Sequence, residues 1–332
     1  MEESIVKVEH LSHRYSVQWA IRDINFEITK NGIYGLLGSN GAGKSTTMNI
    51  MCGVLKQTEG DVYIKGISIS KNPVEAKRHI GFLPQVPPLH PDLTVEEYLR
   101  NAAHLRLMEK SEINKAVDVA LARCSISHFR NRLIKNLSRG YQQAVMIRCG
   151  ISHFAKRVIH NLSGGYQQRV GIAQAIIHNP ELVIFDEPTN GLDPNQIVEI
   201  RHLIKEIAEE RTVILSTHML TEVQAICDHI RMIEEGHLVF SGTVDEFNNY
   251  IVPNSLLVTL KQAPPLNELL QLEGIVNGEE MGDHRFRLSF KDVSGVVERL
   301  VETSVEKKWQ LVEVGVEKKS LDAIFAELSK KK

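Results

Sequence analysis

Short apolar runs alternate with helix-like segments through the first two-thirds of the chain. The runs Gly32–Leu37, Leu182–Phe185 and Thr212–Leu215 consist mainly of apolar residues, which is typical of strands buried on both faces of a parallel sheet. The segments Thr46–Leu55 and Gln167–His178 have the length and spacing of helices. This alternation predicts an α/β fold.

The pattern changes near Gly242–Asn254, where polar and turn-forming residues gather. Beyond this boundary we expect strands at Leu256–Leu260, Arg285–Phe290 and Leu311–Val316, and helices at Pro265–Leu272, Val293–Trp309 and Leu321–Leu328. The sequence therefore predicts a first domain over residues 1–245 and a small α+β domain over residues 254–332. The expected order in the second domain is β-α-β-β-α-β.

A tandem duplication interrupts the first domain. Residues 123–147 and 148–172 are copies of one 25-residue segment and are identical at 17 positions. A solenoid needs at least three repeats, so we interpret the pair as a local duplication. Each copy has a serine and a glycine before a helix-like stretch, at Ser138 and at Ser163. We assign Ser163 to the functional position, because its helix runs directly into the strand that ends at Asp186.

Composition restricts the classes of function. The chain has 332 residues with 39 Lys and Arg against 41 Asp and Glu, for a net charge of −2. This balance gives no support to nucleic-acid binding. No stretch approaches 18 consecutive apolar residues, and the first residues lack a secretion signal. The four cysteines show no C-x-x-C spacing, so we expect reduced thiols in the cytoplasm.

Residues Gly38–Ser45 read G-S-N-G-A-G-K-S, the pattern of a phosphate-binding loop. The glycines let the backbone approach a polyphosphate, and the helix that follows directs its positive end to the same place. Lys44 supplies a charge for the β- and γ-phosphates, and the Ser45 hydroxyl can bind Mg²⁺. The nucleotide-binding residues expected here are Gly38, Ser39, Asn40, Gly41, Ala42, Gly43, Lys44, Ser45 and Thr46.

Other candidate residues carry weaker signals by themselves. Asp186 and Glu187 follow a buried strand, where ligands bind in open α/β sheets, although an acidic pair can simply end a strand. His218 follows another buried strand, and a lone histidine is usually structural. Gln85 follows a strand-like stretch. Ser163-Gly164-Gly165 opens a helix and offers a site for an anion, or only a helix cap.

Taken together and in this order, these motifs resemble the ATP-binding-cassette (ABC) ATPase family. The matching motifs are the phosphate loop, the Q-loop glutamine Gln85, the signature Leu162–Gly165, the acidic pair Asp186-Glu187 with Gly191-Leu192-Asp193, and the switch histidine His218. The resemblance covers residues 1 to about 245. It implies a P-loop NTPase fold with a RecA-like core, an antiparallel β-subdomain and a helical subdomain at about residues 86–165.

The resemblance implies ATP and Mg²⁺ as cofactors. Ser45, Gln85 and Asp186 would hold the metal, and Glu187, Gln85 and His218 would act in hydrolysis. Two cassettes, expected here as a homodimer, would enclose two ATP molecules. Each ATP lies between the phosphate loop of one subunit and Ser163, Gly164, Gly165 and Asp193 of the other. Tyr15 would stack on adenine, although an aromatic residue there could instead pack within the β-subdomain.

The resemblance also implies a separate integral-membrane permease, with this chain at the inner face of the membrane. The tail S-L-D-A-I-F-A-E-L is similar to ATPase subunits of exporters, of the multidrug and gliding-motility type. Three alternatives stay open: an importer subunit, a soluble ABC ATPase, and a member impaired by the duplication. A phosphate-loop kinase leaves the signature and His218 unexplained. We expect the first copy of the duplication to be a surface insertion without function, because such insertions change stability little.

Overall fold

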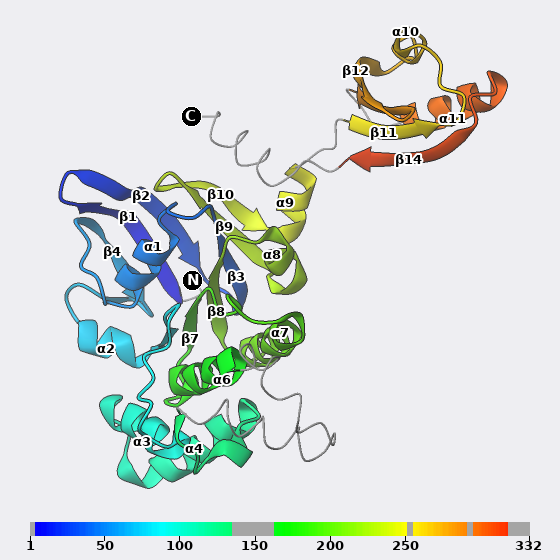
Figure 1. Cartoon of the computed structure of the whole chain (residues 1–332). Coiled ribbons are helices and arrows are strands. Elements are labelled where there is room, and N and C mark those ends of the chain that lie inside the picture. Colours follow the sequence, from blue (N-terminus) through cyan, green and yellow to red (C-terminus); the bar gives the residue numbers. More distant parts are fainter. Residues whose placement is uncertain (1–3, 135–162, 251–254, 291–294, 318–332) are drawn as a thin grey trace, which may run out of the picture. The chain divides into compact units, whose positions relative to one another are not determined.

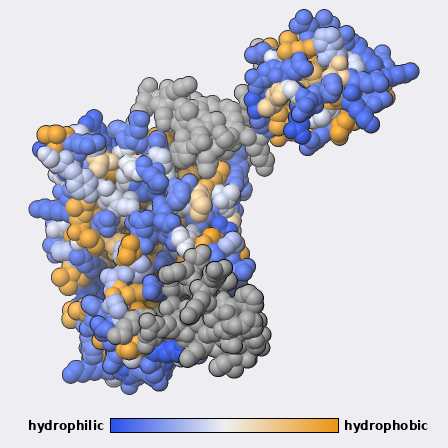
Figure 2. All heavy atoms as spheres, in the orientation of Figure 1, coloured by the Kyte–Doolittle hydropathy of each residue, from blue (hydrophilic) through white to orange (hydrophobic). Residues whose placement is uncertain are grey.

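The computed structural model describes residues 4–134, 163–250, 255–290 and 295–317. The chain forms two compact units, which divide between Val244 and Asp245. Hydrophilic residues dominate the described surface in the view of Figure 2, with apolar residues scattered between them. Figure 1 shows the helices and strands of both units.

A six-stranded sheet forms the centre of the first unit (Figure 1), in the order β10-β9-β3-β8-β7-β6. Its strands are β3 (Gly32–Leu37), β6 (Ile80–Leu83), β7 (Leu182–Asp186), β8 (Thr212–Thr217), β9 (His229–Glu234) and β10 (His237–Thr243). All neighbouring pairs are parallel except β9 with β10. Strands β7 and β8 are buried along their whole length. Their apolar runs therefore reflect burial on both faces.

Helices cover both faces of this sheet. Helix α1 (Lys44–Met51) lies in a core shared with an antiparallel sheet of β1 (Val6–Tyr15), β2 (Gln18–Ile28), β4 (Glu59–Ile64) and β5 (Ile67–Ser68). Helices α7 (Pro194–Ala208) and α8 (Leu220–Ile226) pack on the other face, against β3 and β8. At Gly35 of β3, an added Cβ atom would lie 3.0 Å from Cys227 Sγ. The absence of a side chain there lets α8 pack closely on the sheet.

A helical region follows β6. It contains α3 (Val95–Leu105), α4 (Lys110–Arg123) and the short 3₁₀ helix η1 (Ser127–Phe129), and it packs against α6 (Ser163–Ile176). Thr94 and Glu97 form a capping box at the start of α3, which satisfies backbone N–H groups that the helix leaves free. Helix α2 (Pro73–Arg78) precedes β6. No helix in the described part of the chain is both long and apolar enough to cross a membrane.

The helical region combines parts of both copies of the duplication. From the first copy, Cys124, Ile126, Phe129 and Ile134 are buried. They lie beside the second copy: the rings of Phe129 and Tyr166 are 4.7 Å apart, and Arg169 donates to the carbonyl of Cys124 at 3.0 Å. The prediction that the first copy is a surface insertion is therefore wrong for residues 123–134. Ser138 and the remainder of the duplication up to residue 162 lie outside the described residues.

At some positions where the two copies differ, only the residue of one copy can make the contact that the structure shows. Arg130 of the first copy pairs with Glu96 at 2.6 Å and with Asp118 at 2.7 Å, and the second copy has alanine at its equivalent, position 155. In the second copy, Arg169 pairs with Glu199 at 2.7 Å, and the first copy has Ala144 there. A Cβ atom at Gly171 would lie 2.5 Å from Leu83 Cδ1, and the first copy has methionine at that position.

The second unit has a four-stranded antiparallel sheet in the order β12-β13-β11-β14. Its elements are β11 (Ser255–Leu260), α10 (Leu266–Leu269), β12 (Ile275–Gly282), β13 (Arg285–Phe290), α11 (Val296–Glu306) and β14 (Leu311–Glu317), after α9 (Val244–Tyr250). From β11 to β14 the order is β-α-β-β-α-β, the split β-α-β arrangement. Val258 of β11 is buried in its core with Phe286 of β13 and Leu300 of α11.

Candidate functional site

Five parallel strands of the large sheet end at one edge. The pairing aligns Leu37 of β3 with Thr217 of β8 and with Met232 of β9, and it aligns Asp186 of β7 with Ser216. Leu83, the last residue of β6, is paired with Phe185 and comes two residues before Gln85. The predicted phosphate loop, acidic pair, glutamine and histidine all follow these strand ends. Ligands of open α/β sheets bind at this edge.

The phosphate loop joins β3 to α1, and its backbone requires glycine at two positions. Gly41 and Gly43 have φ values of 83° and 110°, in the region that residues with side chains rarely adopt. A Cβ atom at Gly38 would lie 2.2 Å from the carbonyl oxygen of Ile233, so this part of the loop crosses β9 closely. Because Gly43 is left-handed, α1 begins at Lys44, two residues before the predicted start.

Lys44 is 5% exposed, and its ammonium group donates to the carbonyl oxygens of Gly38 and Ser39 at 3.0 and 2.9 Å. Burial lowers the pKa of Lys44, and the carboxylates of Glu187 and Asp186 oppose this shift. The lysine is therefore held inside the loop, close to the acidic pair. Glu234 stabilises the outer end of the loop, where it accepts the Ser39 hydroxyl at 2.9 Å.

Ser216 connects the acidic pair to the neighbouring strand, and no sequence motif predicted this role. Its hydroxyl donates to Asp186 Oδ1 at 2.5 Å and accepts the N–H of Glu187 at 2.8 Å. Glu187 has a φ of 47°, an uncommon conformation for a residue with a side chain. Ser216 is completely buried. Its place directly before Thr217-His218 was the only sequence signal for this role.

Glu187 and His218 face each other across the ends of β7 and β8. The Nδ1 atom of His218 lies 3.2 Å from Glu187 Oε1. The Glu187 side chain is 11% exposed and that of His218 is 39% exposed. The arrangement places a carboxylate and an imidazole together beside the phosphate loop. A carboxylate in this position can accept a proton from a water molecule, and an imidazole can orient it.

Oxygen ligands suitable for Mg²⁺ are present between the phosphate loop and β7. The Ser45 hydroxyl donates to Asp186 Oδ1 at 3.2 Å, and Gln85 is exposed in the loop after β6. Mg²⁺ commonly binds one or two protein oxygens together with water and substrate phosphates. These side chains fit that preference. Among the described residues, no group of three or more His, Cys, Asp or Glu residues forms a cage for a metal ion.

The signature segment lies at the start of α6, beside α7. Ser163 and Gly164 are the first two residues of α6, and Gly165 packs against the Gln196 side chain of α7. Gly165 and Asp193 line one cavity of about 630 Å³, and no phosphate-loop residue lines it. Asp193 caps α7 by accepting the N–H of Gln196 at 3.0 Å.

Tyr15 is at the end of β1, in the turn to β2, and its side chain is 55% exposed. Its ring contacts the ring of His13 edge-on, with 4.7 Å between the centroids. Trp19 lies instead between Arg14 and Arg22, which approach its ring within 5.7 and 5.1 Å. The Tyr15 face is thus available to a planar ligand, whereas Trp19 is engaged by two guanidinium groups.

Comparison with known proteins identifies the family. The family model described as ABC transporter matches residues 21–151 and 146–190, so two matches that overlap by a few residues meet at the duplication. The chain is 35% identical to the bacitracin transport ATP-binding protein BcrA of Bacillus licheniformis, over 71% of this chain and 69% of that protein. It is 27% identical to the linearmycin resistance ATP-binding protein LnrL of Bacillus subtilis, over 98% of each.

Solved structures give the same result for the fold. A dimeric bacterial ABC transporter cassette matches 72% of this chain and 98% of its own length, at 26% identity and a TM-score of 0.59. This confirms the predicted P-loop ABC cassette. The chain belongs to the ABC transporter family, as an ATP-binding subunit.

Proposed function

We propose that this chain binds ATP with Mg²⁺ and hydrolyses it, and that hydrolysis drives transport through a separate membrane permease. The observation that supports this most directly is the meeting of three groups at one sheet edge. They are the buried Lys44 in the phosphate loop, the Ser45–Asp186 pair and the Glu187–His218 pair. ATPases of this class act mainly by positioning and by electrostatic stabilisation, and these groups supply both.

Each group has a role in the proposed hydrolysis. The N–H groups of the loop and Lys44 bind the β- and γ-phosphates. Ser45, Asp186 and Gln85 would hold Mg²⁺, which would neutralise charge on the phosphate oxygens. Glu187 orients the attacking water and accepts its proton, and His218 fixes the Glu187 carboxylate through their 3.2 Å contact. Tyr15 stacks on the adenine ring.

A second ATP-binding subunit completes the proposed site. Gly165 and Asp193 line a cavity that no phosphate-loop residue lines. We infer a homodimer in which Ser163, Gly164, Gly165 and Asp193 of one subunit contact the ATP that the other subunit binds. The dimeric cassette among the similar structures supports this arrangement.

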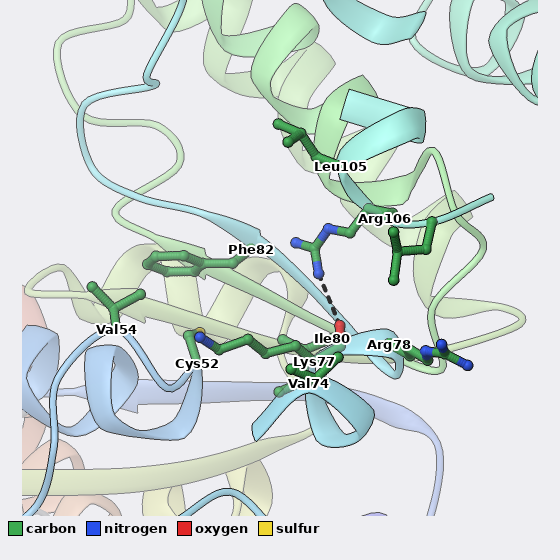
Figure 3. Close-up of a pocket in the computed structure, with 10 residues that line it drawn as sticks. Cys52, Val54, Val74, Lys77, Arg78, Ile80, Phe82, Leu105 and Arg106 are labelled. Carbon is green, nitrogen blue, oxygen red and sulfur yellow. Dashed lines mark hydrogen bonds between the residues drawn. The ribbon is translucent and has the colours of Figure 1, made fainter. Parts of the chain in front are cut away.

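A groove of about 390 Å³ supports the docking of a permease (Figure 3). It lies between the end of α1, helix α2 and the end of α3, and Phe82 and Ile80 of β6 also line it. Val54, Val74 and Leu105 along it are 66%, 64% and 75% exposed. An amphipathic helix with an apolar face fits such a groove. Because β6 leads directly to Gln85, a change at the groove can reach the nucleotide site.

The relatives support export as the direction of transport. LnrL is named for linearmycin resistance and BcrA for bacitracin transport. Resistance through a transporter requires that the compound leave the cell. We therefore place this chain at the inner face of the membrane, in the cytoplasm, as a peripheral subunit of an exporter.

ATP hydrolysis by the purified chain tests the proposal. Lys44→Ala should abolish ATP binding, because the loop loses its buried cation, and Lys71→Ala on the surface serves as its control. Glu187→Gln should bind ATP but reduce hydrolysis by about a hundredfold or more, and it should form a dimer with ATP, measured by light scattering. A wild-type chain without ATPase activity, or a Glu187→Gln chain that stays monomeric at saturating ATP, would contradict the proposal.

A further inference from the structure

A buried carboxylate outside the proposed site links its two catalytic loops. Glu222 lies in the first turn of α8 and is 2% exposed. Its Oε1 atom accepts the hydroxyl of Thr189, and its Oε2 atom accepts the hydroxyl of Thr217 at 2.7 Å. Thr189 is two residues after Glu187, in the loop between β7 and α7. Thr217 is directly before His218, at the end of β8.

The direction of these hydrogen bonds is fixed. The hydroxyl oxygen of Thr217 accepts the backbone N–H of Met219 at 3.0 Å, so its own proton is directed to Glu222. The Thr189 hydroxyl donates to the other carboxylate oxygen. Thr189 and Thr217 are 4% and 2% exposed, and water cannot replace a lost partner there. Both hydroxyl groups find a partner only if each of the two terminal atoms of residue 222 is a hydrogen-bond acceptor, as in a carboxylate.

Burial of the Glu222 carboxylate carries an energetic penalty, which neighbouring groups offset. Arg201 of α7 pairs with it across a longer distance, with 3.7 Å between Nη2 and Oε1. A carboxylate removed from water is unfavourable unless charge and hydrogen bonds compensate for it. Here the compensation comes from both catalytic loops and from the helix that follows one of them. A purely apolar side chain at this position could pack on α8 but could not join the loops.

We propose that Glu222 is a positioning residue, which fixes the distance between Glu187 and His218 by holding the two loops together. The inference rests on the proposed function of that pair in ATP hydrolysis. The 3.2 Å contact between them spans the ends of two strands, and each end continues into a loop bound to Glu222. Small changes in the placement of reacting groups reduce rates strongly.

Two variants test the role, with a matched control on the same strand. In Glu222→Gln, the amide nitrogen faces one threonine and cannot accept its hydroxyl. Thr217→Val removes one of the two contacts with Glu222, together with the acceptor of the Met219 N–H. Thr212→Val makes the same change at the other end of β8, where the buried hydroxyl of Thr212 bonds Asn31 at 3.1 Å. The quantities measured for each variant are kcat, the KM for ATP, the melting temperature and the NMR resonances of the His218 ring.

A positioning role predicts that Glu222→Gln and Thr217→Val lower kcat by roughly 10- to 100-fold, with the KM for ATP changed less than about twofold. The His218 resonances should shift in both variants and stay unchanged in Thr212→Val. If all three variants have the same kcat and unshifted His218 resonances, the proposal is overturned. If Glu222→Gln does not fold, Thr189→Val replaces it, because this change removes only the other contact.

The outcome also separates this inference from the proposed function. A wild-type chain that does not hydrolyse ATP contradicts the proposed function. A chain whose activity is lost in Glu187→Gln but retained in Glu222→Gln and Thr217→Val confirms hydrolysis and overturns only the role of Glu222.

Discussion

At the scale of single residues, the site depends on buried polar groups, each of which has a fixed set of hydrogen-bond partners. Ser216 is the clearest case, because one hydroxyl both donates to Asp186 and accepts the N–H of Glu187. Glu187 has a left-handed backbone, and the hydroxyl supplies the partner that its N–H would otherwise lack. The chemistry of the acidic pair is thus supported from the adjacent strand.

We predict that Ser216→Ala lowers the free energy of unfolding by about 1–3 kcal/mol and also lowers kcat. The buried N–H of Glu187 loses its acceptor, and the carboxylates lose their fixed position. Ser68→Ala is a matched control: the Ser68 hydroxyl donates to Asp61 and accepts the N–H of Lys71 at 3.1 Å, far from the strand ends. Chemical denaturation and steady-state kinetics measure both effects. An equal loss of kcat in both variants would contradict the prediction.

At the scale of elements, an ion-pair cluster joins α3 to the segment around η1. Glu96 accepts Arg130 at 2.6 Å and Arg100 at 2.8 Å. These guanidinium groups lower the pKa of Glu96 from 4.5 to about 2. Because the carboxylate is charged more readily in the folded chain than in the unfolded chain, the cluster contributes stability above about pH 4.5. That contribution is lost as the pH falls towards 2.

We predict that Glu96→Gln is less stable than the wild type at pH 7, and that this difference disappears as the pH is lowered from 4.5 to 2. Below the folded pKa the wild-type side chain is protonated and resembles glutamine. Glu112→Gln, at an exposed position on α4, is the control. Urea denaturation at a series of pH values measures the difference. A difference that persists unchanged at pH 2 would show that the ion pairs are not its source.

Element boundaries show where sequence patterns give reliable predictions. β13 has its predicted bounds, and β7 and β8 extend only one and two residues beyond theirs. Strand β12 fills the second strand position of the predicted β-α-β-β-α-β order, but no range was predicted for it, because it is polar and largely exposed. Backbone hydrogen bonds to β13 hold this edge strand in the sheet. It therefore does not need the alternating apolar face by which strands are predicted from sequence. The predicted helix Leu321–Leu328 lies outside the described residues.

At the scale of the whole molecule, the described helical region contains residues 123–134 of the first copy and residues 163–172 of the second. The two overlapping family matches, 21–151 and 146–190, meet at the boundary between the copies, so each match contains one whole copy. Two deletions of 25 residues therefore give chains of equal length with different packing. Deletion of residues 138–162 joins residue 137 to Ser163 and keeps Arg130, whereas deletion of residues 123–147 puts Ala155 in its place.

We predict that the chain lacking residues 138–162 hydrolyses ATP within about twofold of the wild-type rate, because every described contact is kept and a shorter connection between residues 134 and 163 changes closure entropy slightly. The chain lacking residues 123–147 should be less stable by about 0.5–1 kcal/mol, since it lacks the pairs of Arg130. ATPase assays and thermal unfolding measure both. Greater activity in the first deletion than in the wild type would show instead that the duplication impairs the subunit.

The sequence by itself determined the family, the α/β class and the candidate residues of the nucleotide site. It could do so because glycine spacing, acidic pairs after apolar runs and buried strands depend on local rules of backbone conformation and burial. Only the tertiary structure showed that residues 123–134 of the first copy pack against the start of α6 in the second, and it alone revealed Ser216 and Glu222 as partners of the acidic pair and of the catalytic loops. Those choices depend on contacts between distant parts of the chain, such as Ser216 with Glu187, 29 positions apart, which no local pattern records.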